Sequence, residues 1–303
     1  MSIGTGANQI AEHGRKYVRS EDLSLAVRVA RATNRPLLLF GAPGSGKSTL
    51  AKNIAFDYDL RYYEHVVTAR TTARDLLWSF DSVRRLGDAQ VRREGLRDDD
   101  YVTPGVLWWA FDRADALGLS KSTEPYHDWN SVEKRRDRSA VVLIDEIDKA
   151  DPDVPNSLLV PLAGRYFTIT DLRDAKDVQE KSDPPCLIII TSNQERELPP
   201  AFVRRCVVHQ VREHDEEDLR KIAELHVGTE VDYPLDDLIK ALEKARAKAD
   251  TDRRRRPSTA EFIDAIRACL GIGITSGGHA ELKPVLKMIF NKETGSDSAQ
   301  WSS

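Results

Sequence analysis

The sequence predicts an α/β protein, with a mostly parallel β-sheet flanked by helices and followed by a smaller helical domain. Two observations lead to this expectation. Nearly continuous apolar runs rich in Val, Ile and Leu alternate with long connections that have room for crossover helices, and such runs are typical of parallel strands buried on both faces. After Val211 these runs stop, and apolar residues recur at helical spacing.

Five segments carry the strand pattern. They are PLLLFG (36–41), YYEHVVT (62–68), AVVLIDEI (140–147), CLIIITSN (186–193) and VVHQV (207–211). The small domain is expected to consist of helices over EEDLRKIAELH, PLDDLIKALEKARAKA and TAEFIDAIRACL. We therefore divide the chain into an N-terminal segment (1–19), an α/β domain (20–211), a helical domain (212–290) and a tail (291–303) with too little apolar content to fold.

Two stretches inside the α/β domain are predicted to be charged, exposed loops or insertions, 84–105 and 120–139. Between them, VLWWAF is a predicted helix in which Trp108 and Trp109 belong to the core rather than to a partner-binding surface. Asp148 is expected to cap the segment KADPDVPNSLL that follows it.

Composition excludes several classes of protein. The chain has 303 residues with 45 Lys+Arg against 49 Asp+Glu, so its net charge of −4 argues against a protein that coats nucleic acid. No apolar run approaches the ~20 residues of a membrane span, and the N-terminus lacks the apolar region of a secretory signal. The three cysteines and seven histidines are scattered without disulfide or metal-site spacing. We expect a cytoplasmic protein without membrane insertion.

The segment GAPGSGKST (41–49) fits the pattern G-x-x-x-x-G-K-[ST]. An apolar strand precedes it and STLAKNIAF can begin a helix, which is the context that phosphate binding requires. Backbone N–H groups of the loop would surround a polyphosphate, the lysine would neutralise it, and the serine hydroxyl would hold Mg²⁺. The alternative is a glycine-rich turn without a ligand. The predicted nucleotide-binding residues are Gly41, Ala42, Pro43, Gly44, Ser45, Gly46, Lys47, Ser48 and Thr49.

Acidic residues end the third predicted strand, where open α/β sheets bind ligands. In VVLIDEID, Asp145 is expected to orient Mg²⁺ together with Ser48, and Glu146 to polarise the attacking water. Taken alone, the pair would more often be an ordinary strand exit capped by acids. Downstream of a phosphate-binding loop, the metal and water roles are favoured.

Two further positions complete the candidate site. Asn193 ends the strand CLIIITSN and could hold the attacking water or touch the γ-phosphate, although alone it is a plain turn residue. Arg204 and Arg205 follow a short predicted helix and precede a strand. Such arginines usually form surface salt bridges, and the alternative is an arginine finger that reaches the nucleotide of a neighbouring subunit.

The motifs GAPGSGKS, VVLIDEID, TSN and AFVRRC, in this order, resemble the AAA+ ATPases. Within them, ARDLLWSFDSVRRLGDAQ, YVTPGVLWWAF, IDEIDKADPDVPNSLLVPL and SNQERELPPAFVRRC are similar to segments of the MoxR-type branch. The resemblance covers about residues 20–290. It implies a P-loop NTPase fold with a C-terminal helical lid, bound ATP and Mg²⁺, and a ring, usually a hexamer, with nucleotide between subunits.

By the same resemblance, Lys47, Ser48 and Thr49 belong to Walker A, and Asp145 and Glu146 to Walker B. Asn193 corresponds to sensor 1. Arg205 aligns best with the finger arginine, and Arg204 stays the alternative. The stretch 72–105 corresponds to the helix-2 insert, and RYFTIT (165–170) begins the hairpin before sensor 1.

One departure concerns sensor 2, where related ATPases often place an arginine at the start of a lid helix. In RRPSTAEFIDAI that position corresponds to Ala260. Arg254 or Arg256 would have to substitute, or the lid makes no γ-phosphate contact. The other interpretation of the RRRR run is a solvated basic patch.

Three functions follow as hypotheses. The first is an ATPase that couples hydrolysis to chaperone-like remodelling of a protein partner, for which the resemblance suggests von Willebrand factor A-type proteins. The second is a nucleotide-dependent switch or scaffold with little turnover. The third, a nucleic-acid motor, has only the arginine-rich segments in its favour and the net charge of −4 against it.

Overall fold

The computed structural model describes residues 6–91, 95–119, 122–228, 231–276 and 280–290. The chain forms two compact units. The first comprises 1–41 and 47–211, and the second comprises 42–46 and 212–303. The predicted unfolded tail, 291–303, lies outside the described residues.

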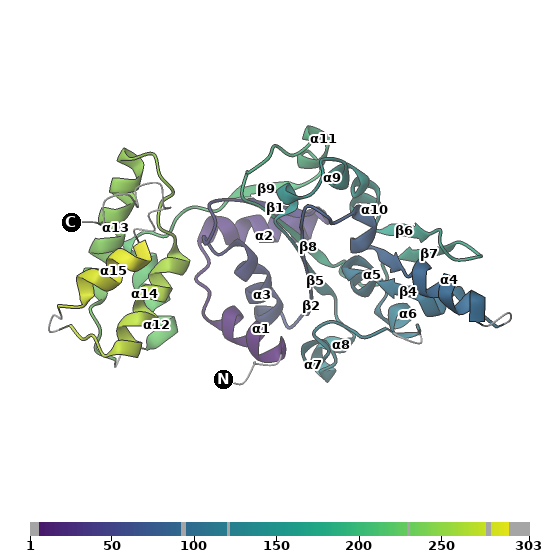
Figure 1. The fold of residues 1–303 in the computed structure, drawn as a ribbon, viewed down its shortest axis with the longest axis horizontal. Coiled ribbons are helices and arrows are strands. Elements are labelled where there is room, and N and C mark those ends of the chain that lie inside the picture. The colour runs from purple at the N-terminus through teal and green to yellow at the C-terminus, as the bar shows by residue number, and fades with distance from the viewer. Residues whose placement is uncertain (1–5, 92–94, 120–121, 229–230, 277–279, 291–303) are drawn as a thin grey trace. The chain divides into compact units, whose positions relative to one another are not determined.

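A five-stranded parallel sheet forms the centre of the first unit, in the order β2–β5–β8–β1–β9 (Figure 1). The strands are β1 (Leu37–Phe40), β2 (Arg61–Val66), β5 (Ala140–Asp145), β8 (Leu187–Ser192) and β9 (Val207–Gln210). Each corresponds to one of the five segments with the strand pattern. The predicted α/β class with a parallel sheet is therefore confirmed.

Alternate residues of the strands enter two separate hydrophobic cores, because side chains along a strand point to opposite faces. On β5, Val142 and Ile144 enter one core, whereas Val141 and Leu143 enter the other. The strand is buried along its whole apolar run. Burial of both faces explains why the central strands β1, β5 and β8 appear in the sequence as continuous apolar runs.

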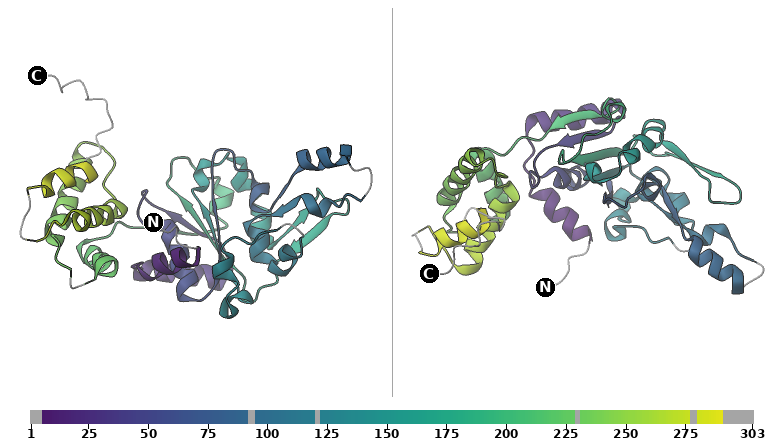
Figure 2. Two further views of the ribbon diagram at one scale, coloured as in Figure 1. Left: turned by 60° about the horizontal axis from the view of Figure 1, so that its bottom comes forward. Right: turned by 45° about the horizontal axis from the view of Figure 1, so that its top comes forward.

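Helices cover both faces of the sheet (Figures 1 and 2). One core is completed by α1 (Gly6–Arg15), α2 (Glu21–Thr33) and α3 (Lys47–Asp57). Helix α1 packs closely on α3, and Asn53 Nδ2 of α3 donates a 2.8 Å hydrogen bond to Gly14 O.

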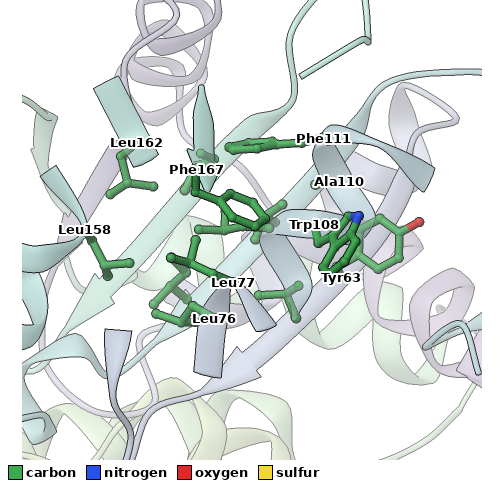
Figure 3. Close-up of a cluster of buried hydrophobic side chains, with 14 of the residues drawn as sticks. Tyr63, Leu76, Leu77, Trp108, Ala110, Phe111, Leu158, Leu162 and Phe167 are labelled. Atoms are coloured by element: carbon green, nitrogen blue, oxygen red, sulfur yellow. The ribbon is translucent and has the colours of Figure 1, made fainter. Parts of the chain in front are cut away.

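The other core is completed by α5 (Val106–Phe111), α10 (Leu159–Gly164) and an antiparallel hairpin of β6 (Tyr166–Ile169) and β7 (Lys176–Gln179). Figure 3 shows its aromatic centre, where the Phe167 ring lies 6.2 Å from the rings of both Trp108 and Phe111. Trp108 and Trp109 are at most 1% exposed, so their predicted place in the core is confirmed.

The sequence had indicated an exposed, charged loop or insertion at 84–105. The structure shows that this segment is not simply a loop. It contains most of helix α4 (Ser82–Val91), a 3₁₀ turn η2 (Asp98–Tyr101) and strand β4 (Val102–Pro104), which pairs with β3 (Trp78–Phe80). Helix α4 buries none of its residues. Its few apolar side chains face outward, so the sequence offered no buried stripe from which to predict a helix.

The segment 120–139 is also only partly the exposed loop that its polarity indicated. Two short helices, α7 (His127–Asn130) and α8 (Glu133–Arg136), lie in it. The buried Asn130 side chain accepts a hydrogen bond from Tyr62 N and donates one to Tyr62 O, at 2.8 and 3.1 Å. Strand β2 is an edge strand, so this amide satisfies backbone groups that no neighbouring strand reaches.

The second unit is helical where it is described beyond residue 211. It contains α12 (Glu216–Val227), α13 (Leu235–Thr251), α14 (Thr259–Ile272) and α15 (Leu282–Phe290) around a core that includes Leu219, Leu242 and Phe262. The remaining helices of the first unit are η1 (Ala73–Leu76), α6 (Arg113–Leu117), η3 (Ile147–Lys149), α9 (Asp153–Ser157) and α11 (Pro200–Val203). In the part of the chain that the structure describes, no helix has the length and apolar character of a membrane span.

Candidate nucleotide-binding site

The loop from Gly41 to Gly46 joins β1 to helix α3, which begins at Lys47. Gly44 and Gly46 have φ angles of 77° and 89°, in the left-handed region that glycine adopts without strain. The Ser45 hydroxyl is buried without a hydrogen-bond partner. A loop between a buried strand and a helix N-terminus, with an unsatisfied buried hydroxyl, has the form of a phosphate-binding site.

The Lys47 side chain connects this loop to a second strand. Its Nζ donates hydrogen bonds of 2.8 Å to Gly41 O and to Asn193 Oδ1. Burial lowers the pKa of the Lys47 ammonium, and the carboxylates of Asp145, Asp148 and Glu146 counteract part of that shift. The negative charge of a bound phosphate would favour the protonated ammonium further.

Ser48, Asp145 and Thr191 come together at the carboxyl ends of the strands. Ser48 Oγ donates a 2.7 Å hydrogen bond to Asp145 Oδ1, and Thr191 Oγ1 donates one of 2.5 Å to the same oxygen. The structure thus places the two predicted metal ligands, Ser48 and Asp145, in direct contact. The role of Thr191 was not predicted, although a hydroxyl in the apolar strand CLIIITSN was a signal that could have indicated it.

Glu146 lies just beyond β5 in a left-handed backbone conformation, with φ 60° and ψ 48°. Its N–H donates a 2.9 Å hydrogen bond to Thr191 Oγ1, which holds this uncommon conformation. Its carboxylate accepts 3.1 Å from Asn193 Nδ2 and 2.6 Å from Lys149 Nζ. The backbone conformation turns the side chain towards Asn193.

Asn193 therefore lies between a cation and an anion. Its Oδ1 accepts from Lys47, and its Nδ2 donates to Glu146. Since an ammonium can only donate and a carboxylate can only accept, these partners fix the orientation of the amide group. The three predicted residues Lys47, Asn193 and Glu146 form one connected hydrogen-bonded chain.

Asp148 does not cap the segment that follows it, so that prediction was wrong. Its side chain is buried, and Oδ2 accepts hydrogen bonds from Asn193 N and Glu195 N, at 3.1 and 2.9 Å. The 3₁₀ turn η3 directs this carboxylate to the loop after β8 instead of along the chain. Asp148 holds the backbone on which Asn193 sits.

Arg204 and Arg205 lie at the opposite side of the sheet, where the strands begin. In the parallel pair of β1 and β9, Leu37 lies opposite Val207 and Phe40 opposite Gln210. The predicted phosphate-binding loop follows the carboxyl end of β1, whereas the two arginines precede the amino end of β9. The structure therefore does not bring them to the Lys47–Asn193–Glu146 group of the same chain.

A pocket of about 430 Å³ adjoins these arginines. Its charged lining residues are Arg35, Arg165, Arg204 and Arg205, with no acidic residue among the described ones that line it. The Arg35 guanidinium donates to the backbone carbonyls of Arg204 and Arg205 and fixes the turn that carries them. Neither Arg204 nor Arg205 forms an ion pair with any residue that the structure describes. The usual surface salt-bridge role is thus not observed.

Arg256, one of the two arginines considered for sensor 2, has acidic neighbours in the second unit, and so has Arg255, which was not a candidate. Arg256 pairs with Glu213 at 3.1 Å and with Asp250 at 3.5 Å, and Arg255 lies 3.6 Å from Glu261. Ala260 is the second residue of helix α14. These ion pairs occupy Arg256 within its own unit.

The sequence of the α/β domain matches a known family model. Residues 36–206 match the AAA domain of the dynein-related subfamily, which is more than half of the chain. The chain belongs to this AAA family. No curated protein matches it closely enough to count as a relative.

Solved structures similar to this AAA chain share little sequence with it. A point variant of RuvB from Thermotoga maritima is 15% identical, with a TM-score of 0.48 over 96% of this chain and 72% of that one. A putative ATPase from Cytophaga hutchinsonii is also 15% identical, with a TM-score of 0.42 over 93% and 84%.

AAA domains generally bind a nucleotide, typically with Mg²⁺, and the residues of this AAA chain fit such a group. Ser48 and Asp145 offer a hydroxyl and a carboxylate, the hard oxygen ligands that Mg²⁺ prefers beside phosphate oxygens. Within the described ranges, no group of three or more His, Cys, Asp or Glu side chains could hold a metal by itself. A site with few protein ligands is suited to a metal that arrives with a phosphate. All three cysteines are free and buried.

Proposed function

We propose that this AAA protein binds and hydrolyses ATP with Mg²⁺, in a ring of identical chains that remodels a protein partner. The observation that carries the proposal is the chain of contacts Lys47–Asn193–Glu146 beside the Ser48–Asp145 pair. These five side chains come from a loop–helix junction and two strand ends, and they meet at the carboxyl ends of the strands. Such convergence of a cation, an amide and carboxylates is what phosphoryl transfer to water requires.

Each side chain has a distinct role in this proposal. Lys47 binds the β- and γ-phosphates, and the loop 41–49 surrounds them with backbone N–H groups. Glu146 accepts the proton of the attacking water, and Asn193 orients the water or the γ-phosphate. Ser48 and Asp145 hold Mg²⁺, which supplies charge neutralisation on the phosphate oxygens when bound.

The ring is proposed because a group needed for hydrolysis lies far from the rest. Arg205, or its neighbour Arg204, would offset transition-state charge, but both lie at the amino ends of the strands, opposite the phosphate-binding loop. Their distance from the site of their own chain supports a role at the nucleotide of another chain. The pocket beside them, whose charged lining residues in the described part of the chain are all arginines, suits an approaching phosphate or acidic surface.

The finer assignment is to the MoxR-type branch, with residues 20–211 as the AAA domain and 212–290 as the helical lid. In it the insert 72–105 carries α4, whose outward apolar residues Val83, Leu86 and Val91 are at least 63% exposed. Exposed apolar side chains on a helix favour a protein partner over nucleic acid. We place the protein in the cytoplasm and name a von Willebrand factor A-type protein as the partner class.

One observation favours the second candidate, a nucleotide-dependent switch with little turnover. Arg256 is held by Glu213 and Asp250, and Ala260 stands where a sensor-2 arginine is expected. A lid without that arginine would leave the γ-phosphate one cation short. The ATPase then needs either the arginine of a neighbour or the remodelled partner to reach full rate.

The testing experiment is the ATPase rate per chain as a function of protein concentration, for wild type and Glu146→Gln. A rate that climbs with concentration and falls by roughly 100-fold or more in the variant supports hydrolysis at sites completed between chains. Tight ATP binding with negligible turnover at all concentrations would favour the switch. A concentration-independent rate would contradict the ring.

A further inference from the structure

The structure connects a fourth residue, Lys149, to the Lys47–Asn193–Glu146 chain. Its Nζ lies 2.6 Å from Glu146 Oε2, while Asn193 Nδ2 donates to Oε1. Both oxygens of the Glu146 carboxylate are therefore held by side chains from different elements. We propose that Lys149 is a positioning residue, which fixes the Glu146 carboxylate in the orientation that accepts a proton from the attacking water. This inference rests on the proposed ATPase function.

The pair is not an ordinary ion pair of one helix. Glu146 has left-handed backbone angles and precedes the turn η3, to which Lys149 belongs. Lys149 N donates a 3.0 Å hydrogen bond to Glu146 O, which closes the turn and brings the ammonium back over the carboxylate. The Thr191 hydroxyl holds the Glu146 N–H from the other side. The backbone of Glu146 is thus fixed by two bonds, and its side chain by two more.

The need for a second anchor follows from the length of the glutamate side chain. Three rotatable bonds separate its carboxylate from the backbone, and each must be held for the group to lie near a water. Asn193 alone holds one oxygen and leaves the carboxylate free to pivot about it. Lys149 removes that freedom. Other acidic groups near Lys149, Glu195 and Asp148, act on it only through their charge, and its hydrogen bond goes to Glu146.

Exposure of the pair decides which measurement can detect it. The side chains of Lys149 and Glu146 are 39% and 28% exposed. A pair so accessible to water adds little to folding stability. The ion pair should therefore affect the orientation of the Glu146 carboxylate rather than the free energy of unfolding, so an unfolding experiment would be a poor test.

The first measurement uses the nucleotide-free protein and needs no turnover. In protein labelled with ¹³C at glutamate Cδ, the Glu146 signal is identified by its loss in Glu146→Gln. In Lys149→Met, which keeps an unbranched side chain of nearly the same length and removes the charge, this signal should move, and in Lys149→Arg it should return towards its original position. Lys221→Met is the matched control, because Lys221 forms a 2.6 Å pair with Glu217 on the exposed surface of α12. It should move the Glu217 signal and leave Glu146 unchanged.

The second measurement separates positioning from binding. Lys149→Met should lower kcat by roughly tenfold and leave ATP affinity within twofold, since loss of a whole general base costs 10²–10⁴-fold and Asn193 still holds one oxygen. Lys149→Arg should restore most of kcat. Three results for Lys149→Met would each overturn the inference. They are a Glu146 signal that does not move, a kcat that is unchanged or increased, and a loss of ATP affinity as large as the loss of kcat. A wild-type protein without turnover at any concentration would instead contradict the proposed function, and the carbon signal would still show whether Lys149 holds Glu146.

Discussion

Lys47 Nζ and Asn193 Oδ1 lie 2.8 Å apart, although 146 residues separate them along the chain. The contact exists because β1 and β8 are neighbours in the parallel sheet, with Phe40 opposite Ser192. Lys47 begins the helix that follows β1, and Asn193 directly follows β8. Parallel pairing thus places the lysine proposed to bind phosphate beside an amide that also contacts the proposed base.

Loss of the Lys47 ammonium should abolish most nucleotide binding. We expect Lys47→Ala to weaken ATP affinity by roughly 100-fold, because two charge-assisted hydrogen bonds to phosphate are worth about 3 kcal/mol together. Isothermal titration with ATP and Mg²⁺ measures this. The control is Lys52→Ala on the same helix, whose Nζ lies 3.3 Å from Glu64. Equal affinity of Lys47→Ala and wild type would refute the loop assignment.

Two inactive variants should restore activity when mixed, if the arginine acts across an interface. Arg205→Ala keeps its own Glu146, and Glu146→Gln keeps its Arg205, so a site formed between the two variants contains both groups. With random mixing of equal amounts, about a quarter of the sites in a head-to-tail ring should be intact. The ATPase rate of the mixture measures this, and Arg204→Ala in place of Arg205→Ala tests the neighbouring arginine. If neither mixture gains activity, the trans role is wrong.

Asp148 should contribute to both folding and turnover. Asp148→Ala leaves the N–H groups of Asn193 and Glu195 without their buried acceptor, at a cost of about 2 kcal/mol in the free energy of unfolding. Urea denaturation measures the loss, and Asp153→Ala, at an exposed position in α9, is the control. Because Asn193 would also lose its backbone support, kcat should fall in Asp148→Ala. Two variants of equal stability would contradict the role of Asp148.

Glu124 should make stability depend on pH. The side chain is fully buried and accepts hydrogen bonds from Arg113, Tyr63 and His127. Burial by itself raises the pKa of this carboxyl, but the hydrogen bonds together with the Arg113 charge lower it overall. A lowered folded-state pKa means that the stabilisation is fully present above the ordinary value of about 4.3 and is lost as pH falls through the folded value.

We therefore expect Glu124→Gln to lose about 3 kcal/mol of unfolding free energy at pH 7, because Arg113 is left without its buried partner. The difference from wild type should narrow below about pH 4, where wild type also loses the carboxylate charge. Urea denaturation across pH 3–8 measures the difference in unfolding free energy at neutral and at acidic pH. Glu133→Gln, at an exposed position of the same segment, should show no such trend. A constant difference across this pH range would show that the charge is unimportant.

The sequence predicted the centre of the sheet well because strands β1, β5 and β8 are buried on both faces. β5 and β8 enter two cores with alternate side chains, so their segments are almost wholly apolar and easily recognised. Helix α4 has no buried face, and its pattern did not differ from that of a loop. The helices within 120–139 were missed because Asn130 and Glu124 are polar residues that are buried with partners, and polarity alone indicates exposure.

In the candidate site, too, the sequence predicted some residues and missed others. Lys47, Ser48, Asp145, Glu146 and Asn193 were predictable because each lies in a recognisable motif at a strand end, and the structure brings them together. Asp148 and Lys149 were not, because their partners are set by the left-handed conformation at Glu146, which turns the chain back towards β8. A single residue with left-handed backbone angles cannot be recognised from a sequence pattern.

The separation of the phosphate-binding loop from Arg204 and Arg205 has a consequence for assembly. In the proposed mechanism each chain carries two unlike half-sites, one at the carboxyl ends and one at the amino ends of its strands. Under the proposed trans mechanism, an open row of chains always leaves one half-site unmatched at each end. Closing the row into a ring joins these last two halves and creates one more working site without adding a chain. Ring closure would then raise the catalytic capacity per chain, detectable as a step in specific activity when an open row of chains closes into a ring.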